Sequence, residues 1–470
     1  MDKHRGLYAN SIAGLSVKMK DGGVSPTELV KDLIARIERI DKDLNSFITF
    51  NRNALVIAEE REQELQFGKY RGPLHGIPIG LKDVIFTKGI RTTMGSEIFK
   101  DYIPAKDAFV VEQLKKAGAI IVGKLNTHQF AYGPTGDRSY YGVVANPHDK
   151  SKMSGGSSSG SAAAVAACLC YGALGTDTGG SIRIPSSFCG IVGMKPTYGS
   201  ISKRGVYPLS WVLDHVGPMT RTITDNAIML NAIIAYDKED PDAIYRKPED
   251  YTRLIGKDVK DIKIGIPEEF YYEDLDAEVD TCIQDAIKCL ERLGVKMTTV
   301  NIPSMHEFSE AHKVILRSDA YAIHAQNLLD YPTKWDDEVK ERLITALDTK
   351  GYDYAKAMRT QKLAKQEYRE VLDTVDALIT PTMSILPPNI NERHTGKDKS
   401  DEHHIRWTIT KLTAPTNLSG FPSLTLPCGF SADRMPIGVQ LIGKEFDEAK
   451  LYQIGYALEQ ALLVEMPVFD

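Results

Sequence analysis

The chain has 470 residues, an apolar fraction of 42% and a formal net charge of −6 at neutral pH. This length leaves room for one large α/β domain or for two or three smaller domains, and the apolar fraction suffices for a sizeable core. A weakly acidic chain without a basic cluster offers no surface for direct binding of nucleic acid or of a membrane.

Six cysteines occur without CxxC spacing, which favours buried reduced thiols over a disulfide framework. The first residues, MDKHR, are not followed by an apolar core, so we expect no signal peptide. The most apolar run, residues 162–174, is shorter than the ~20 residues that span a bilayer. These features predict a soluble, cytoplasmic protein.

Helices and strands are predicted to alternate along the chain. The segment SPTE at residues 25–28 is a capping box with proline at the first helical position, and it begins a predicted helix. Further helices are predicted at residues 108–117, 160–170 and 277–293. Strands are predicted at residues 119–123, 172–176, 262–266, 295–300, 376–381 and 422–427. This alternation predicts a mostly parallel sheet with helices on both faces.

Two segments rich in glycine and serine flank the predicted helix at 160–170: GGSSSGS at residues 155–161 and GTDTGGS at residues 175–181. The first matches the GxSxG elbow of α/β-hydrolases, but that elbow directly follows a strand, and residues 146–152 are polar and turn-like. No Gly-Lys-Ser/Thr follows, which argues against a phosphate-binding loop. The pair His403-His404 lacks the further ligands of a metal site.

Lys82 lies in an apolar segment, IGLKDVI at residues 79–85. A serine hydroxyl is a weak nucleophile that needs a base, and a lysine amine can be that base when burial lowers its pKa from the usual value of ~10.4. Two interpretations of Lys82 remain open on this ground: a buried base, or a surface lysine paired with Asp83. Similarly, the glycines at 179–180 permit either a cluster of N–H groups that stabilises an anion or a simple tight turn.

Five segments together resemble the amidase signature family. They are PLHGIPIGLKD at residues 73–83, GGSS at 155–158, DTGGSIRIP at 177–185, GMKPT at 193–197 and MPIGVQLIG at 435–443. The spacing of Lys82, Ser157 and Ser181 is also typical of these enzymes. The resemblance implies a single domain over residues 1–470, with an N-terminal helical segment at about 1–65 and a central mixed sheet of about eleven strands covered by helices on both faces.

The resemblance also implies a catalytic triad. Ser181 is the expected acylated nucleophile, Ser157 follows a cis peptide bond and relays a proton, and Lys82 is the base. The expected oxyanion hole consists of backbone amides from Thr178, Gly179, Gly180 and Ser181. Asp177 and Arg183 are expected to support this loop as an ion pair. No metal or organic cofactor is implied.

One position departs from the family pattern, since Ser159 stands where the family commonly has glycine. A serine fits there only if the backbone does not need a positive φ.

Two functions of different class are compatible with the resemblance: a stand-alone amide hydrolase, and the glutaminase (A) subunit of the tRNA-dependent glutamine amidotransferase. The segment THQFA at 127–131 replaces the MDEFA that is usual in the amidotransferase and favours the hydrolase. Alignment by hand places Ala364 and Thr410 where the amidotransferase holds glutamine with an arginine and an aspartate, and Arg359 lies nearby. Without these partners a charged amino acid would be costly to bury.

We therefore expect cleavage of the C–N bond of small uncharged amides, or of carbamates, through an acyl-enzyme. Ala131, Tyr132 and Gly133 are predicted to contribute to the substrate pocket, together with the polar segment at 391–404. The protein is expected to bind a small molecule and to contact neither nucleic acid nor membrane directly, and a homodimer is the family-level expectation. A non-catalytic scaffold is disfavoured because all three relay residues are present.

Overall fold

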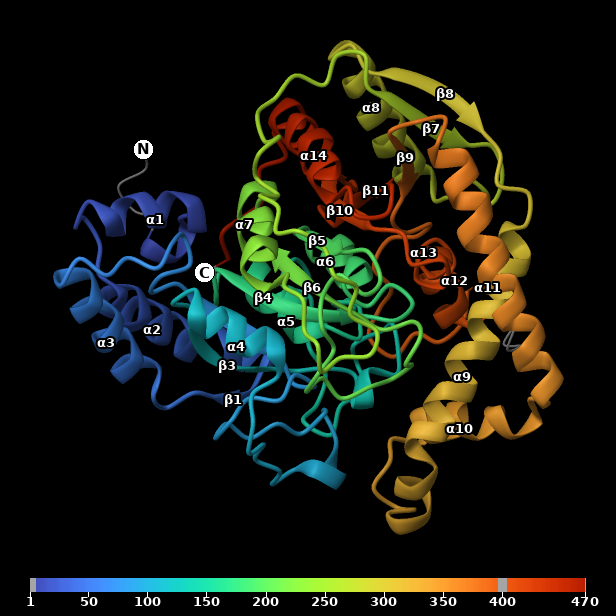
Figure 1. The fold of residues 1–470 in the computed structure, drawn as a ribbon. Coiled ribbons are helices and arrows are strands. Elements are labelled where there is room, and N and C mark those ends of the chain that lie inside the picture. Colours follow the sequence, from blue (N-terminus) through green and yellow to red (C-terminus); the bar gives the residue numbers. More distant parts are fainter. Residues whose placement is uncertain (1–5, 396–403, 470) are drawn as a thin grey trace.

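An eleven-stranded sheet forms the centre of the chain in the computed structural model, which describes residues 6–395 and 404–469 (Figure 1). The strands, in chain order, are β1 (Phe47–Phe50), β2 (Pro78–Lys82), β3 (Ile120–Leu125), β4 (Gly172–Asp177), β5 (Val192–Lys195), β6 (His215–Thr220), β7 (Lys263–Pro267), β8 (Lys296–Val300), β9 (Ala377–Pro381), β10 (Ser423–Phe430) and β11 (Pro436–Gly443). Their order across the sheet is β1-β3-β2-β4-β6-β5-β10-β11-β9-β7-β8.

The sheet is mixed. Its parallel pairs are β2–β3, β2–β4, β7–β8 and β7–β9, and the other six neighbouring pairs are antiparallel. The prediction of a mostly parallel sheet is therefore wrong, whereas the mixed sheet implied by the family resemblance is confirmed. Alternating helices and strands do not fix the direction in which the chain re-enters the sheet, and β10 and β11 form a hairpin with no helix between them.

Fourteen α-helices are formed by the described residues: α1 (Ile12–Lys20), α2 (Pro26–Leu44), α3 (Ala54–Gln66), α4 (Phe109–Lys116), α5 (Ser159–Ala166), α6 (Arg183–Cys189), α7 (Ile223–Ile233), α8 (Ala277–Arg292), α9 (Met305–Asp330), α10 (Asp337–Ile344), α11 (Gly351–Leu372), α12 (Ile405–Thr410), α13 (Ala414–Ser419) and α14 (Glu448–Leu462). Short 3₁₀ helices occur at Leu7–Ala9, Glu97–Phe99, Gln129–Ala131 and Thr345–Asp348. None of these helices is both long and apolar enough to cross a bilayer.

Two glycines of β4 show that helices pack on both faces of the sheet. A Cβ atom on Gly172 would clash with Met229 of α7, whereas a Cβ atom on Gly175 would lie 2.8 Å from Oγ of Ser158, next to α5. Residues an odd number of positions apart in a strand face opposite sides. The loop that leads into α5 therefore lies on the face opposite α7.

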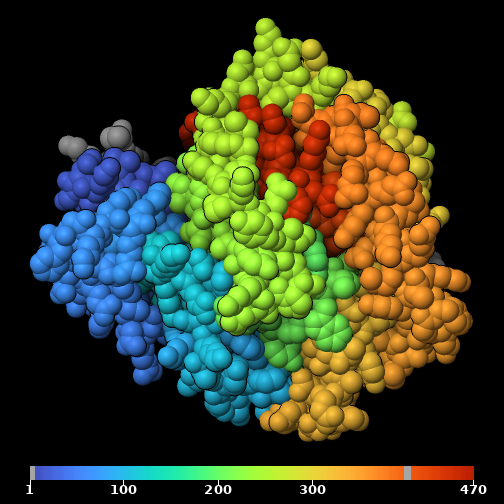
Figure 2. Space-filling model, viewed as in Figure 1, coloured from blue at the N-terminus to red at the C-terminus, as the bar shows by residue number. Residues whose placement is uncertain are grey.

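The N-terminal helices pack at one side of the molecule (Figures 1 and 2). The expected helical segment at 1–65 is only partly helical within its described part, because β1 interrupts it and pairs with β3 at the edge of the sheet. The capping box predicted at Ser25 is present at the start of α2.

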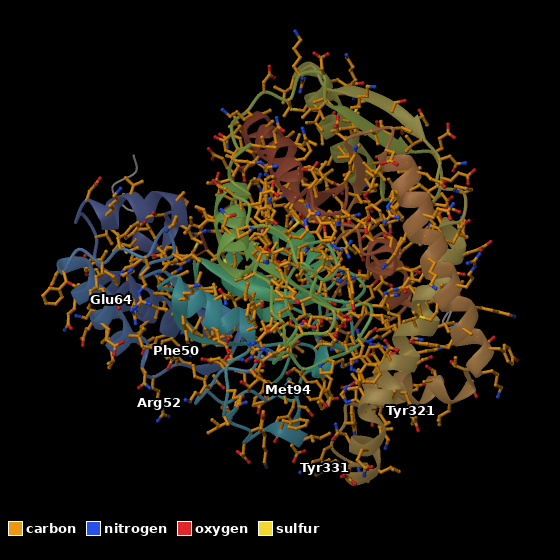
Figure 3. All side chains as sticks on the ribbon, viewed as in Figure 1. Phe50, Arg52, Glu64, Met94, Tyr321 and Tyr331 are labelled. Atoms are coloured by element: carbon orange, nitrogen blue, oxygen red, sulfur yellow. The ribbon has the colours of Figure 1, made fainter. Side chains whose placement is uncertain are left out.

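Side chains fill the space between the helices and the sheet, and on the side of α9 and α11 they form a second apolar cluster (Figure 3). The centre of the sheet and these two helices therefore form the two walls between which a site can lie.

Candidate active site

Lys82 lies at the edge of the sheet where β2 and β4 end. These strands are parallel, with Leu81 opposite Leu174, so their carboxyl ends meet at the same edge. The amine of Lys82 donates hydrogen bonds to Oγ1 of Thr176 and to Oγ of Ser157, each at 2.7 Å. Its side chain therefore lies in the interior beside both glycine-serine segments.

The alternative interpretation of Lys82 as a surface residue paired with Asp83 is wrong. Lys82 is fully buried. The carboxylate of Asp83 instead accepts a hydrogen bond from the backbone N–H of Thr93 at 2.8 Å. Successive residues of an extended chain point to opposite sides, which separates these two neighbours.

Burial changes the acidity of Lys82. Removal from water lowers the pKa of its amine to about 7, against the opposing attraction of the Asp214 and Asp177 carboxylates. Burial disfavours the charged form of an amine, and the two carboxylates are too few or too far to restore it. The neutral amine is therefore accessible near neutral pH.

Ser157 is fixed by hydrogen bonds to its backbone. The peptide bond between Gly156 and Ser157 is cis, as the family resemblance implies. The carbonyl oxygen of Ser157 accepts hydrogen bonds from Oγ1 of Thr127 at 2.9 Å and from the N–H of His128 at 3.2 Å. These contacts orient the Ser157 hydroxyl toward Lys82.

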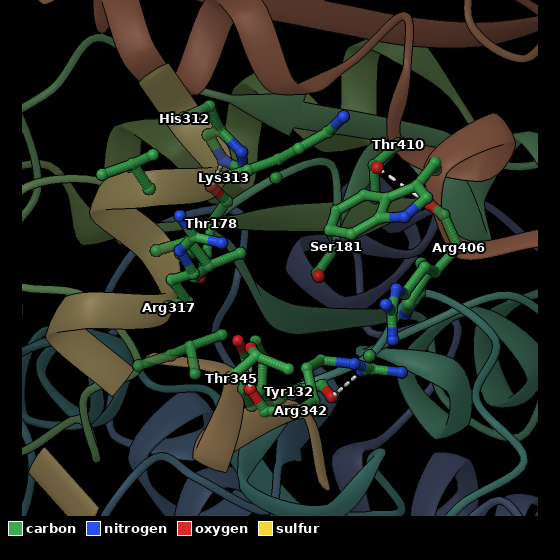
Figure 4. Close-up of a pocket in the computed structure, with 18 of the residues that line it drawn as sticks. Tyr132, Thr178, Ser181, His312, Lys313, Arg317, Arg342, Thr345, Arg406 and Thr410 are labelled. Carbon is green, nitrogen blue, oxygen red and sulfur yellow. Dashed lines mark hydrogen bonds between the residues drawn. The ribbon is translucent and has the colours of Figure 1, made fainter. Parts of the chain in front are cut away.

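Ser181 lies in the loop between β4 and α6, and its hydroxyl points into a cavity (Figure 4). The N–H of Ser158 donates to the carbonyl oxygen of Ser181 at 3.3 Å, which joins the two serine loops. Within residues 6–395 and 404–469, the Ser181 hydroxyl forms no hydrogen bond, to Ser157 or to any other side chain. The structure thus brings Lys82 and Ser157 into contact and places Ser181 beside them with its hydroxyl facing the cavity.

The loop at 178–182 carries backbone amides that lack protein acceptors. The N–H of Gly180 donates to Oδ1 of Asp177 at 2.8 Å. Among the described residues, the amides of Thr178, Gly179 and Ser181 have no acceptor, so three of the four predicted donors remain available. Gly180 has a φ of +125°, and a Cβ atom there would clash with the Thr413 side chain, so this position requires glycine.

Two side chains outside the loop fix its conformation. Nε2 of His312 on α9 donates to the carbonyl oxygen of Thr178 at 2.8 Å, and Oγ1 of Thr178 donates to Asp214 at 2.6 Å. Burial lowers the pKa of His312 to about 4, so its ring is neutral at physiological pH. Sequence reasoning missed His312, because α9 follows the loop by more than a hundred residues.

Asp177 and Arg183 form the expected ion pair, at 2.9 Å between two fully buried side chains. Arg183 also donates to Thr416, Asn417 and Gln440. The adjacent guanidinium holds the pKa of the Asp177 carboxyl well below its usual range. This pair links the loop at 178–182 to α13 and β11.

The cavity in front of Ser181 has a volume of about 550 Å³. Its lining includes the three predicted residues Ala131, Tyr132 and Gly133. The predicted contribution of the segment at 391–404 is not observed for its described residues, and residues 396–403 lie outside the described part of the chain. Instead, the next helix, α12, contributes Arg406, Trp407 and Thr410.

Charged side chains from three elements also line the cavity, which the sequence analysis did not anticipate: Glu310, Lys313 and Arg317 from α9, Arg342 from α10 and Arg406 from α12. Thr410 lines the cavity as the alignment by hand implied, but Ala364 is buried in the second apolar cluster and Arg359 is exposed. Glu310, Lys313 and Arg317 recur at helical spacing, which was the available signal.

Ser159 is accommodated without strain. It is the first residue of α5 and does not have a positive φ. The departure from the family pattern therefore leaves the loop intact. Among the described residues, no group of three or more His, Cys, Asp or Glu side chains could hold a metal ion.

A family model for amidases matches residues 28–452. The chain belongs to the amidase signature family. It is thus a member of a hydrolase family that acts on C–N bonds.

The relatives of this amidase-family chain include both classes of protein considered above. It is 37% identical to the glutaminase (A) subunit of the glutamyl-tRNA(Gln) amidotransferase of Exiguobacterium sp. strain AT1b, over 97% of this chain and 98% of that protein. It superposes with a TM-score of 0.93, at 28% identity, on a chain of a vestigial protein complex of an s-triazine catabolic enzyme, covering 97% of this chain and 100% of the other. For the peptide amidase of Stenotrophomonas maltophilia, the TM-score is 0.86 and the identity 31%, over 99% of both chains.

Proposed function

We propose that this chain is a stand-alone amidase that forms an acyl-enzyme on Ser181. The observation that carries the proposal is the fully buried Lys82, hydrogen-bonded to Ser157 beside a loop whose Ser181 hydroxyl faces the cavity. The lowered pKa of Lys82 fits the task of a base near neutral pH.

In the acylation step, the neutral amine of Lys82 accepts the proton of Ser157, and Ser157 accepts the proton of Ser181. Oγ of Ser181 then forms a bond to the carbonyl carbon of the amide. The free amides of the loop at 178–182 stabilise the negative oxygen of the tetrahedral intermediate. The C–N bond breaks as the proton returns from Lys82 through Ser157 to the departing nitrogen.

In the second step, water replaces the amine. It loses a proton through the same relay, attacks the ester carbon and releases the carboxylic acid, while Ser181 regains its proton. The relay from Ser181 to Ser157 requires rotation of the Ser181 hydroxyl toward Ser157, since no hydrogen bond joins them in the unliganded site. Catalytic hydrogen bonds commonly shorten only when substrate is bound.

A second candidate function is the glutaminase component of a tRNA-dependent amidotransferase. It is favoured by the 37% identity to the Exiguobacterium amidotransferase protein over nearly the whole chain. Against it stands the position of Ala364, which is buried in the apolar cluster rather than facing the cavity. The prediction that the substrate is an uncharged amide or a carbamate also stays open, and the basic lining of the cavity argues against an uncharged amide.

Release of ammonia by the purified chain tests the proposal. The substrates are butyramide, benzamide, glutaramate, ethyl carbamate and glutamine, and the Ser181→Ala variant serves as the blank. We expect the chain alone to hydrolyse at least one of the simple amides. Hydrolysis of glutamine only, and only after addition of the other components of an amidotransferase, would contradict a stand-alone amidase.

A further inference from the structure

Basic side chains outnumber acidic ones in the cavity. The lining contains Lys313, Arg317, Arg342 and Arg406, against the single carboxylate of Glu310. In Figure 4, the three arginines approach the Ser181 hydroxyl from different sides. A cavity of about 550 Å³ with this lining has a positive potential at the position where substrate must bind.

Arg317 is the basic residue that lacks an acidic partner. Within residues 6–395 and 404–469 it forms no ion pair, and its Nε is buried without a hydrogen-bond acceptor. A buried guanidinium N–H without an acceptor is costly. The side chain thus has unused hydrogen-bonding capacity at the wall of the cavity.

The other cations are better compensated or held by aromatic rings. Lys313 pairs with Glu310 at 2.6 Å and lies 4.6 Å from the centre of the Trp407 ring. The guanidinium of Arg406 lies at the same distance from this ring. Arg342 pairs with Glu338 at 2.6 Å. Arg138 and Arg393 share that carboxylate, so Glu338 neutralises only part of this charge.

We propose that the cavity binds amides that carry a carboxylate on the acyl side, that is, monoamides of small dicarboxylic acids, and that Arg317 binds this carboxylate. The inference rests on the proposed amidase function and names its substrate class. A guanidinium presents N–H groups in a planar fork that matches a carboxylate, and such charged hydrogen bonds are stronger than neutral ones.

The same lining disfavours an α-ammonium group. Glu310 is the one carboxylate among the described lining residues, and Lys313 already occupies it. A substrate such as glutamine would place its ammonium among cations. The cavity therefore favours glutaramate over glutamine, although the two differ only by the amino group.

The test compares matched substrates. Malonamate, succinamate and glutaramate are paired with propionamide, butyramide and valeramide, in which a methyl group replaces the carboxylate. For at least one pair, we expect kcat/KM to be 10-fold or more higher for the anionic amide. Arg317→Gln should reduce this ratio by about 10- to 100-fold, mainly through KM, and Arg317→Lys should restore part of it.

The matched control is Arg359→Gln, because Arg359 is an exposed arginine outside the cavity. This variant should keep the wild-type ratio of anionic to neutral amide. A second measurement does not depend on turnover: glutaramate binding to Ser181→Ala by calorimetry, which the added Arg317→Gln change should weaken by a similar factor. Thermal unfolding of each variant identifies loss of fold.

The outcomes separate this inference from the amidase function. Turnover of both series without preference for the carboxylate, an unchanged ratio in Arg317→Gln, or a preference for glutamine over glutaramate would overturn the inference and leave the amidase function standing. Turnover of no amide in either series, with no acyl-enzyme formed, would overturn the amidase function itself.

Discussion

Lys82 and Lys124 are two buried lysines on neighbouring strands with different tasks. Lys82 contacts two hydroxyls at the cavity side. Lys124 donates to the carbonyl oxygen of Ile85 and to the hydroxyls of Thr87 and Thr92 at 3.2 Å. Only the first lies beside the serines, so burial alone does not identify a base, and geometry decides between the two.

Methionine substitutions separate the two lysines, since methionine keeps the volume and removes the amine. Lys82→Met should lower kcat by at least about 100-fold with little change in the thermal midpoint. Lys124→Met should lower the free energy of unfolding by about 1–3 kcal/mol, because it leaves buried acceptors without a donor. Kinetics and thermal unfolding of both variants check this. Wild-type kcat in Lys82→Met would remove Lys82 as the base.

The pH dependence follows from the lowered pKa of Lys82. The protonated amine cannot accept a proton, so log kcat/KM should rise with pH and level off above about pH 7, near the lowered pKa. The Asp214 carboxylate raises that pKa, so Asp214→Asn should move the acidic limb to lower pH. Asp43→Asn, which changes an exposed carboxylate, serves as control. A limb that stays in place or moves to higher pH in Asp214→Asn would contradict this assignment.

At the scale of elements, the loop at 178–182 depends on glycine. An alanine at Gly180 would combine a positive φ with a clash at Thr413. Gly180→Ala should therefore cost about 1–3 kcal/mol of strain or displace the loop, with a large loss of kcat. Gly351→Ala at the start of α11 is the matched control, because a Cβ atom there meets nothing within 4 Å. Equal kcat values in the two variants would argue against a role for this loop in holding the anion.

Much of this arrangement could be predicted from sequence, and the limits have physical reasons. Strands β4 and β9 and helices α4 and α8 lie within one or two residues of the predicted ranges, because their apolar patterns and end residues are local signals. Helix α5 ends at Ala166, earlier than predicted, and Cys168 adopts a positive φ within a run that reads as helical. Strand direction is not local, so the mixed sheet could come only from the resemblance.

The candidate site divides in the same way. Lys82, Ser157 and Ser181 lie in glycine-rich segments that mark themselves in the sequence. Arg317 and His312 reach the site only because α9 packs beside the loop at 178–182. No local pattern specifies which face of a helix meets a distant loop, so the charge of the cavity was missed.

At the scale of the whole molecule, Arg183 connects the loop to distant segments. It joins Asp177 to α13 and β11 through buried hydrogen bonds. Arg183→Met should leave the Asp177 carboxylate buried without its partner and destabilise the fold by about 3–5 kcal/mol. Urea or thermal unfolding measures this, with Arg359→Gln as an exposed-arginine control. An unfolding midpoint equal to that of the control would show that the pair does not support the fold.

The central claim is that Lys82 activates Ser181 through Ser157, and mapping a covalent adduct tests it most directly. Phenylmethylsulfonyl fluoride modifies activated serines by displacement of fluoride. Trypsin should release residues 153–183 as one peptide that contains both Ser157 and Ser181, so fragmentation must locate the label. We predict a single label on Ser181, formed far more slowly in Lys82→Met and absent in Ser181→Ala. A label on another residue, or unchanged labelling in Lys82→Met, would contradict the account.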